Sequence, residues 1–348
     1  MSKTVVGVDI GVRSIRGVEV SNYAGTKPVI VRMAEQALPG HAVRRGEVVE
    51  PGTVAAALKR LWSTGGFKSK DVVLGMGGQR TFARDIHVPR APLAQIRESL
   101  PFQVQDLLPV AVSDVLMDFY PIHEEEGEQG PQVMGLLVAG HKDAINGNVD
   151  AVTRAGLRPV HVDLVPFALS RAILPARSAR GRDVIVAIGA NTTHVIVVGD
   201  GVPVFVRMIS TGGDDITQAI VSRLQWDPEG AEQAKRAIGM GSALMRAEDR
   251  PVLEVIYEIA GELISNIRST LSYYAGSQPN YPLQRLLLTG GGAELTGLAG
   301  AIGELTGLPV AKVDALAGLS LPRTRGQSAP SDASPYTTAF GLALGSHE

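Results

Sequence analysis

The sequence predicts an α/β protein made of two lobes. Its 348 residues exceed the ~250–300 residues at which a single hydrophobic core stops growing. Short runs rich in β-branched residues alternate with helical patterns along the chain. Residues 6–20 and residues 184–198 both show a strand, a glycine turn with small polar residues, and a second strand. We therefore expect two halves that open in the same way.

The composition is that of a soluble globular protein and excludes several classes. Hydrophobic residues make up 45%, charged residues 20%, and the formal net charge is -2, so no global basic excess favours nucleic acid or an anionic membrane. The chain has no cysteine, which excludes disulfides, thiolate zinc sites and cysteine nucleophiles. The first residues run directly into a strand pattern, so we expect no signal peptide. No segment approaches the ~18–20 apolar residues of a membrane span.

The first 80 residues predict a sheet and one helix. Each expected strand is a short β-branched run that ends at glycine or polar residues. The helix over 51–64 has Pro51 in its first turn, and Gly65 and Gly66 end it. The strands are expected at residues 4–10, 15–20, 28–36 and 72–76.

The pattern changes between about residues 82 and 158, where an inserted unit is expected. Its acidic run at 124–128 predicts a solvated loop joining two strands of a hairpin, because like charges repel. Apolar residues around Phe102 suit either a peptide-binding groove or the core of the unit itself. The expected elements are strands at 82–88, 118–122 and 133–139 and helices at 91–108 and 142–155. A strand at 159–163 and a helix at 166–174 follow.

A basic, small-residue segment at 176–182 predicts a linker between the halves. Residues 322–335 are polar and rich in Pro and Ser, which predicts a loose loop. A short helix over 336–344 closes the chain. Between these points we expect strands at 184–188, 193–199, 203–210, 286–288 and 309–313 and helices at 213–224, 228–237, 251–275 and about 295–306.

The two glycine hairpins can be aligned residue by residue. Asp9 corresponds to Ala187, and Gly11 corresponds to Gly189. Amide groups at such turns point into one concavity and bind anions, so two turns that face each other would clamp a polyphosphate. The candidate cradles are Gly11, Val12, Arg13 and Ser14, with Arg16 as an added cation, and Gly189, Ala190, Asn191, Thr192 and Thr193.

Three further features would complete a nucleotide site. Gly212 and Gly213 open a helix whose N-terminus favours anions. Glu232 and Lys235 lie three residues apart on one helix face and would reach a ribose or a base. A third turn contains Gly290, Gly291, Gly292 and Glu294. Taken singly, these features equally fit a simple turn, an exposed ion pair and an ordinary strand-to-helix connection.

The order of these motifs resembles the actin-like ATPase superfamily, and within it the PilM family of type IV pilus assembly proteins. The phosphate turns are generic to the superfamily. The segments that resemble the PilM and FtsA branch more specifically are Leu100-Pro-Phe102, Ala155-Gly156-Leu157 and Pro166-Phe167-Ala168-Leu169.

The resemblance implies the actin-like (ribonuclease H-like) two-lobe ATPase fold with an FtsA/PilM-type inserted subdomain 1C. The first lobe would span residues 1–180 (subdomain 1A), with 1C at about 82–158. The second lobe would span 181–335 (subdomains 2A and 2B, with 2B at about 214–280). Residues 336–348 would return to the first lobe.

The resemblance also implies ATP and Mg²⁺ in the cleft between the lobes, with Asp9 orienting Mg²⁺ through water. Asp9 equally fits a turn-capping role. Two departures stand out: Ala187 occupies a position that is usually acidic, and Arg16 one that is usually Lys. Loss of one carboxylate weakens placement of the metal and of the attacking water, and Arg contacts phosphate with a planar fork rather than a point charge. We expect nucleotide binding with weak or no hydrolysis, and we assign no catalytic residue.

The expected partner is the N-terminal cytoplasmic peptide of a PilN-like inner-membrane protein, together with other proteins of the pilus assembly platform. The expected location is the cytoplasm, at the inner membrane through that partner, with no nucleic acid and no membrane insertion. Self-association stays open, as does a role in a related type II secretion system.

Two other functions compete with this one. A sugar kinase of the same superfamily would need a catalytic base, and residues 76–81 offer Gln79 but no Asp. An FtsA-like filament protein would carry its own basic amphipathic anchor, whereas residues 341–348 are short and not basic.

Overall fold

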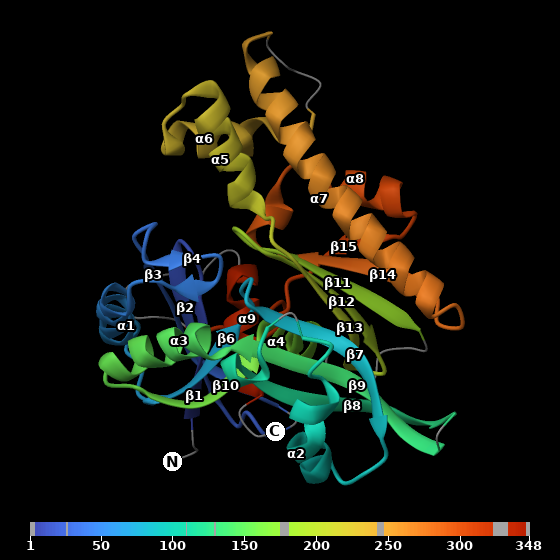
Figure 1. Cartoon of the computed structure of the whole chain (residues 1–348). Coiled ribbons are helices and arrows are strands. Elements are labelled where there is room, and N and C mark those ends of the chain that lie inside the picture. The colour runs from blue at the N-terminus through green and yellow to red at the C-terminus, as the bar shows by residue number, and fades with distance from the viewer. Residues whose placement is uncertain are drawn as a thin grey trace.

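The computed structural model describes residues 4–25, 27–108, 110–128, 130–174, 181–241, 247–322 and 333–345. Two five-stranded sheets, one in each lobe, form its framework (Figure 1). Both sheets place three antiparallel strands beside two parallel ones, in the orders β3-β2-β1-β6-β10 and β13-β12-β11-β14-β15. The related openings of the two halves therefore correspond to two sheets of the same topology, and the predicted two-lobe α/β fold is confirmed.

The first sheet is covered by two helices on each face. Helices α1 (Pro51–Gly65) and α3 (Lys142–Arg154) share a core with one face, and α4 (Val165–Ile173) and α9 (Thr337–Leu344) contribute to the core on the other. Helix α1 ends where Gly66 adopts a left-handed conformation. The strands are β1 (Thr4–Ile10), β2 (Ser14–Ser21), β3 (Val29–Ala37), β6 (Asp71–Met76) and β10 (Arg158–Leu164), and a small hairpin of β4 (Val43–Arg44) and β5 (Glu47–Val48) follows β3.

Helix α9 approaches the first lobe closely through glycine. A Cβ on Gly7 of β1 would lie 1.9 Å from the carbonyl oxygen of Ala339. A Cβ on Gly341 would lie 1.9 Å from the carbonyl oxygen of Ala168 in α4. No side chain fits at either position, so these glycines let α9 pack against β1 and α4. The end of the chain thus completes a core begun by its first strand.

An inserted unit lies in the chain between β6 and α3. Its three-stranded sheet has the order β7-β9-β8, and Ile96 and Leu100 of its helix are buried against it. The helix expected to reach residue 108 ends at Gln103, and the Val104 amide makes the capping bond to Leu100. The elements are β7 (Thr81–Pro89), α2 (Leu93–Gln103), a 3₁₀ turn η1 (Val112–Asp114), β8 (Val115–Gly127) and β9 (Gly130–His141).

The acidic run at 124–128 is solvent-exposed, as expected, but most of it belongs to a strand rather than to a loop. Strand β8 continues to Gly127, and Glu124 pairs in register with Val133 of β9. Arg90 contacts Glu124 at 3.0 Å, and the imidazoles of His87 and His123 lie 3.0 and 3.1 Å from Glu125. The loop prediction was wrong because pairing with β9 carries the strand through the acidic run, and a contact such as that of Arg90 reduces the repulsion between like charges.

The second lobe places its helices over one face of its sheet and contacts the first lobe with the other. Residues of α5, α7 and α8 join one face in a shared core. The strands are β11 (Arg182–Ile188), β12 (Thr193–Gly199), β13 (Val202–Ile209), β14 (Leu283–Thr289) and β15 (Val310–Lys312). The helices are α5 (Gly213–Leu224), α6 (Pro228–Ile238), α7 (Arg250–Ser277) and α8 (Leu298–Thr306), with 3₁₀ turns η2 (Ala247–Asp249), η3 (Gly291–Glu294) and η4 (Ser334–Tyr336).

The lobes meet through buried apolar side chains. Phe167 and Leu169 of α4 and Leu136 of β9 pack in one cluster with Ile196 of β12 and Leu287 of β14. This contact holds the two sheets together on one side of the molecule, where β9 and α4 lie beside β12 and β13 (Figure 1). Most of the expected linker (176–180) and of the expected loose loop (323–332) lies outside the described residues. Within those residues, no helix has both the length and the hydropathy that a membrane crossing needs.

Candidate functional site

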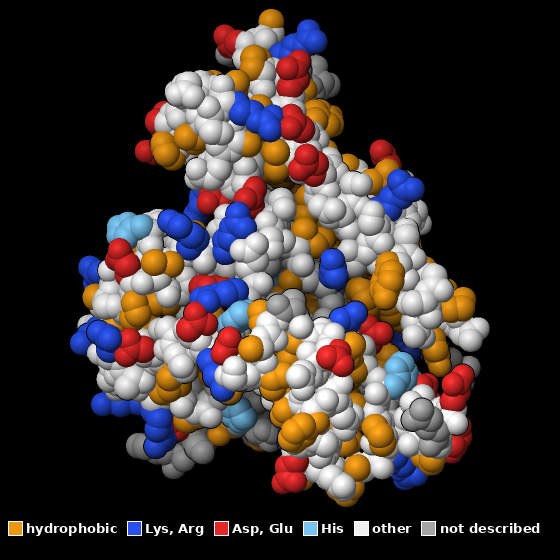
Figure 2. All heavy atoms as spheres, in the orientation of Figure 1, with side chains coloured by type: hydrophobic (Ala, Val, Ile, Leu, Met, Phe, Trp, Pro, Cys, Tyr) orange, Lys and Arg blue, Asp and Glu red, His pale blue; other side chains and the backbone are white. Residues whose placement is uncertain are grey.

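A cleft of about 340 Å³ opens between the two lobes. The turn that joins β1 to β2 lines it from the first lobe. The turn that joins β11 to β12, and the turn that follows β14, line it from the second. Figure 2 shows the surface notched between the α5–α6 part and the part below it, with Lys, Arg, Asp and Glu side chains at the notch. The two hairpin turns thus face a common space.

The two hairpin turns have the same geometry. The Gly11 amide donates to the Ser14 carbonyl oxygen at 3.0 Å, and the Gly189 amide donates to the Thr192 carbonyl oxygen at 2.9 Å. Asp9 pairs in register with Arg16, as Ala187 does with His194. The alignment made from sequence therefore corresponds to matching positions in the two lobes.

Both turns carry amides that are suited to an anion. Among the described residues, no acceptor is found for the backbone N–H groups of Val12 and Arg13 in the first turn or of Ala190 and Asn191 in the second. All four residues line the cleft. Buried or half-buried amides seek an acceptor, and amides that converge from two turns fit the oxygens of a polyphosphate.

The third turn presses against the second. Gly290 has φ of 90°, and a Cβ there would lie 2.4 Å from the carbonyl oxygen of Ile188. A Cβ on Gly213, at the start of α5, would lie 3.2 Å from the Gly292 Cα. Gly291 differs, because nothing lies within 4 Å of its Cβ position. This turn therefore needs glycine for packing at Gly290 and leaves room for a ligand at Gly291.

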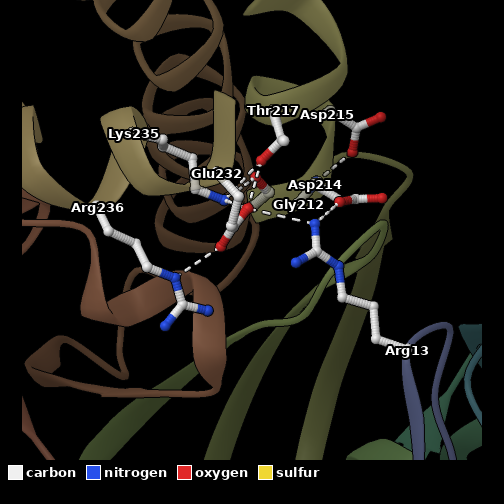
Figure 3. A network of polar contacts seen from close by, with 9 residues as sticks. Arg13, Gly212, Asp214, Asp215, Thr217, Glu232, Lys235 and Arg236 are labelled. Atoms are coloured by element: carbon white, nitrogen blue, oxygen red, sulfur yellow. Dashed lines mark hydrogen bonds and ion pairs between the residues drawn. The ribbon is translucent and has the colours of Figure 1, made fainter. Parts of the chain in front are cut away.

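Glu232 and Lys235 form the centre of a polar network on α5 and α6 (Figure 3). The Lys235 ammonium is buried and donates to Glu232 Oε2 at 2.7 Å, Thr217 Oγ1 at 2.8 Å and the Gly213 carbonyl at 2.9 Å. Burial lowers the pKa of Lys235. Burial alone would raise the pKa of Glu232, but hydrogen bonds from Lys235, Thr217 and Arg236 outweigh it and lower that pKa to about 2. The two side chains form a charged pair at neutral pH.

Arg13 joins this network from the other lobe. Its Nη2 donates to Asp214 Oδ1 and, at 3.2 Å, to Glu232 Oε2. In Figure 3 its side chain rises from the first-lobe turn to reach residues of α5 and α6. The candidate phosphate turn therefore already makes an ionic contact across the cleft.

The floor of the cleft holds Asp9 beside Arg16. Burial raises the pKa of Asp9, Arg16 opposes this effect, and Glu35 adds to it. The Arg16 guanidinium donates to Glu35 Oε1 at 2.7 Å, so the side chain that we expected to contact phosphate has a carboxylate partner. In the described parts of the chain, no group of three or more metal-ligating side chains converges.

His194 closes the back of the cleft. Its Nε2 lies 3.1 Å from the Gly77 carbonyl oxygen. Burial lowers its pKa to about 4, although the bond to Gly77 opposes this effect. The imidazole is therefore neutral at pH 7, and Nε2, which faces a carbonyl oxygen, carries the proton.

Three expected site residues lie outside the lining of the cleft. Thr193 is buried and donates to the Thr211 carbonyl at 2.8 Å. Gly212 caps α5 through its amide, which donates to Asp215 Oδ2 at 2.7 Å. Glu294 is exposed and pairs with Lys312 at 2.9 Å. The other expected residues line the cleft: Asp9, Gly11, Val12, Arg13, Ser14, Arg16, Gly189, Ala190, Asn191, Thr192, Gly213, Glu232, Lys235, Gly290, Gly291 and Gly292.

Sequence reasoning missed several lining residues. Asp214 follows the glycine pair directly, and His194 faces Ala187 in the second hairpin, so the motif and the register could have identified both. Gly46 of the β4–β5 hairpin and Thr337 of α9 also line the cleft. No local signal marks these two, because long-range packing places them there.

Comparison with known proteins decides the family. The family model described as "Type IV pilus assembly protein PilM" matches residues 7–347. The chain belongs to the PilM family. A solved PilM–PilN type IV pilus biogenesis complex is similar over 99% of this chain and 98% of that one, with 26% identity and a TM-score of 0.83.

More distant relatives of this PilM-family chain support the same fold. FtsA of Enterococcus hirae is 23% identical over 356 aligned residues, which cover 89% of this chain and 78% of FtsA. FtsA of Bacillus subtilis is 21% identical over 62% of this chain, and the match spans 56% of that protein's length. MreB5 of Spiroplasma citri, solved with AMPPNP, is 11% identical with a TM-score of 0.56, over 98% of this chain and 95% of that one.

Proposed function

We propose that this PilM-family chain binds ATP in the interlobe cleft and acts as a nucleotide-binding scaffold of the type IV pilus assembly platform. The observation that carries the nucleotide part is the pair of matched turns, whose four amides without acceptors face one cleft. The MreB5 structure with AMPPNP has the same fold and supports this proposal. A scaffold protein of a related type II secretion system would bind ATP in the same way.

We assign a part of the nucleotide to each wall of the cleft. The turns at Gly11 and Gly189 would hold the phosphates through their amides. Glu232, held in place by Lys235, would accept a hydrogen bond from a ribose hydroxyl, and Lys235 would support it from behind. The open side of Gly291 leaves space for the planar base to lie against backbone.

We expect weak ATP hydrolysis because of the residue that precedes the second hairpin turn. Mg²⁺ bound with the nucleotide would neutralise phosphate charge, and Asp9 would hold it through water. The matching position in the other lobe is Ala187, so no carboxylate at that position orients a metal or a water. His194 stands beside it, but its Nε2 is committed to Gly77. The cleft therefore favours binding over turnover.

Calorimetric titration with MgATP, together with a phosphate-release assay, tests this function. We expect saturable binding by the wild-type chain and turnover far below that of an efficient ATPase. Lys235→Met should weaken binding, whereas Arg223→Ala should not, because Arg223 pairs with Glu258 away from the cleft. Absence of ATP binding by the folded wild-type chain would refute the nucleotide part.

For the partner, we propose the N-terminal cytoplasmic peptide of a PilN-like inner-membrane protein, which would also bring the chain to the membrane. The similar PilM–PilN complex supports this choice. On the inserted unit, Ile96, Leu100 and Val104 are buried in its own core, so they are explained without a partner. Phe102, 83% exposed, and Leu116, 50% exposed, are not.

The edge strand of the first-lobe sheet is the surface that we propose for the peptide. Strand β10 ends the sheet order, and Val160 and Val162 on it are exposed. An unpaired edge with apolar side chains suits an extended peptide, which adds as a strand. We place the peptide along β10, between the first lobe and the inserted unit.

Fluorescence anisotropy with the labelled PilN-like peptide tests this placement. Val160→Asp should reduce affinity at least tenfold. Val29→Asp is the matched control, because Val29 is 52% exposed on β3 at the opposite edge of the same sheet. Equal affinities of the two variants would exclude the β10 edge.

A further inference from the structure

Apolar contacts join the two lobes on one side of the cleft, and ionic contacts join them on the other. At the back, the apolar cluster that contains Phe167 and Ile196 joins the lobes, and burial of apolar area is insensitive to salt at moderate concentration. At the mouth, the contact is ionic, from Arg13 of the first lobe to Asp214 and Glu232 of the second. With an apolar contact on one side and an ionic contact on the other, the two lobes can open and close about the apolar side.

Arg13 can exchange its carboxylate partners for another anion. Its side chain is 48% exposed, whereas those of Asp214 and Glu232 are only 13% and 16% exposed. Glu232 keeps Lys235, Arg236 and Thr217 as partners when Arg13 leaves. Release of Arg13 therefore leaves Glu232 fully partnered, and the arginine can turn to another anion in the same cleft.

A second cation faces the same acidic edge. Arg45, between β4 and β5, donates to Gln79 at 3.1 Å. Burial raises the pKa of Asp215, next to Asp214; the Gly212 amide opposes this rise, and so does the charge of Arg45. The first lobe therefore places a second positive charge, that of Arg45, near enough to act on Asp215 at the start of α5.

We propose that Arg13 is an ionic latch between the lobes, and that the phosphates of an entering nucleotide compete with Asp214 and Glu232 for its guanidinium. The competition rests on the nucleotide binding proposed above, whereas the latch itself does not. Arg13 would thereby couple occupancy of the cleft to the relative position of the lobes, because a guanidinium bound to phosphate no longer ties it to α5.

The latch is expected to be weak and sensitive to salt. Because the Arg13 side chain is about half exposed, we expect its loss to change the ratio of closed to open forms by only about 1.4- to 5-fold. Added salt screens such a contact and leaves the apolar cluster intact. Opening should therefore shift populations of two forms rather than unfold either lobe.

Distance measurements between two spin labels test the latch directly. The chain has no cysteine, so Ala56→Cys on α1 and Ala237→Cys on α6, both exposed, give one label in each lobe. Without nucleotide, Arg13→Ala should move the distance distribution toward longer values. Asp214→Asn should do the same, and the double variant should open no further than either alone. Arg223→Ala, which breaks an exposed Arg–Glu pair within the second lobe, should match the wild-type chain.

The outcomes separate the latch from the nucleotide. If Arg13→Ala and Asp214→Asn both leave the distribution unchanged at low salt, the latch is refuted, whether or not ATP binds. If they open the cleft and AMPPNP brings wild type and Arg13→Ala to one common distribution, both the latch and the competition stand. If they open the cleft and AMPPNP binds the wild-type chain without weakening the effect of Arg13→Ala, the competition is refuted. High salt should open the wild-type chain and leave Arg13→Ala unchanged.

Discussion

His194 of β12 lies with its Nε2 3.1 Å from the carbonyl oxygen of Gly77, the residue that follows β6. The contact joins the second lobe to the first behind the cleft. A Cβ on Gly77 would lie 2.8 Å from Nε2, so only glycine lets the ring approach. Because the imidazole is buried, its pKa of about 4 is below the ordinary 6.5.

This pKa predicts acid sensitivity. The unfolded chain binds a proton at His194 that the folded chain does not bind between about pH 6.5 and about pH 4. The stabilisation is therefore fully present above that window and is lost as the pH falls through it. From about pH 7 to about pH 5, the loss from this one group is roughly 2 kcal/mol.

Urea unfolding at both pH values measures the effect. His194→Gln should show a smaller loss than the wild-type chain by about that amount, because glutamine does not titrate. His161→Gln, at an exposed position on β10, should behave like wild type. The same loss in all three proteins would contradict the assignment to His194.

Gly291→Ala separates stability from binding. Nothing lies within 4 Å of the Cβ position, so the free energy of unfolding should change by less than about 0.5 kcal/mol. The methyl group would occupy the space assigned to the base, and ATP affinity should fall at least fivefold. Gly300→Ala on α8 is equally open and should leave affinity unchanged. Unaltered ATP affinity in Gly291→Ala would mean that the base lies elsewhere.

Ala187→Asp should raise Mg²⁺-dependent ATP turnover. The substitution returns a carboxylate to the position that matches Asp9, and a well-placed general base contributes about 10²–10⁴-fold. We expect at least a tenfold increase together with a lower melting temperature, because a new charge is partly buried. The measurement is the rate of phosphate release at saturating ATP. If the folded variant hydrolyses ATP no faster than the wild-type chain, Ala187 does not limit hydrolysis.

Lys235→Met should destabilise the second lobe. The ammonium makes three hydrogen bonds in a buried position, and removing one partner of a buried pair costs about 3–5 kcal/mol. Because Glu232 retains Arg236 at 2.7 Å, we expect roughly 2 kcal/mol. The Arg236 side chain is 75% exposed, so Arg236→Met should lower the free energy of unfolding by less than about 1 kcal/mol. Urea unfolding compares the two, and equal losses would contradict the role of burial.

The sequence predicted the parts of the site that are encoded locally. Gly11 and Gly189 mark tight turns between β-branched strands, and both turns line the cleft. The partners of Arg13 could not be predicted, because Asp214 and Glu232 lie 201 and 219 residues away in the chain and belong to the other lobe. The loop predicted for the acidic run was wrong for a similar reason: the residues that contact it, Val133 of β9 and Arg90, lie elsewhere in the chain.

The close fit of α9 between β1 and α4 has a consequence for biosynthesis. Ala339, Phe340 and Leu342 belong to the same core as Val5 and Val18, so the first lobe cannot complete its hydrophobic interior until that helix has been synthesised. The second lobe's main core draws on residues between Val184 and Ile302 and needs nothing from α9. During translation the half made later can therefore fold first, although domains generally fold from the N-terminus onward. Until α9 is synthesised, β1 and β2 would leave apolar surface exposed.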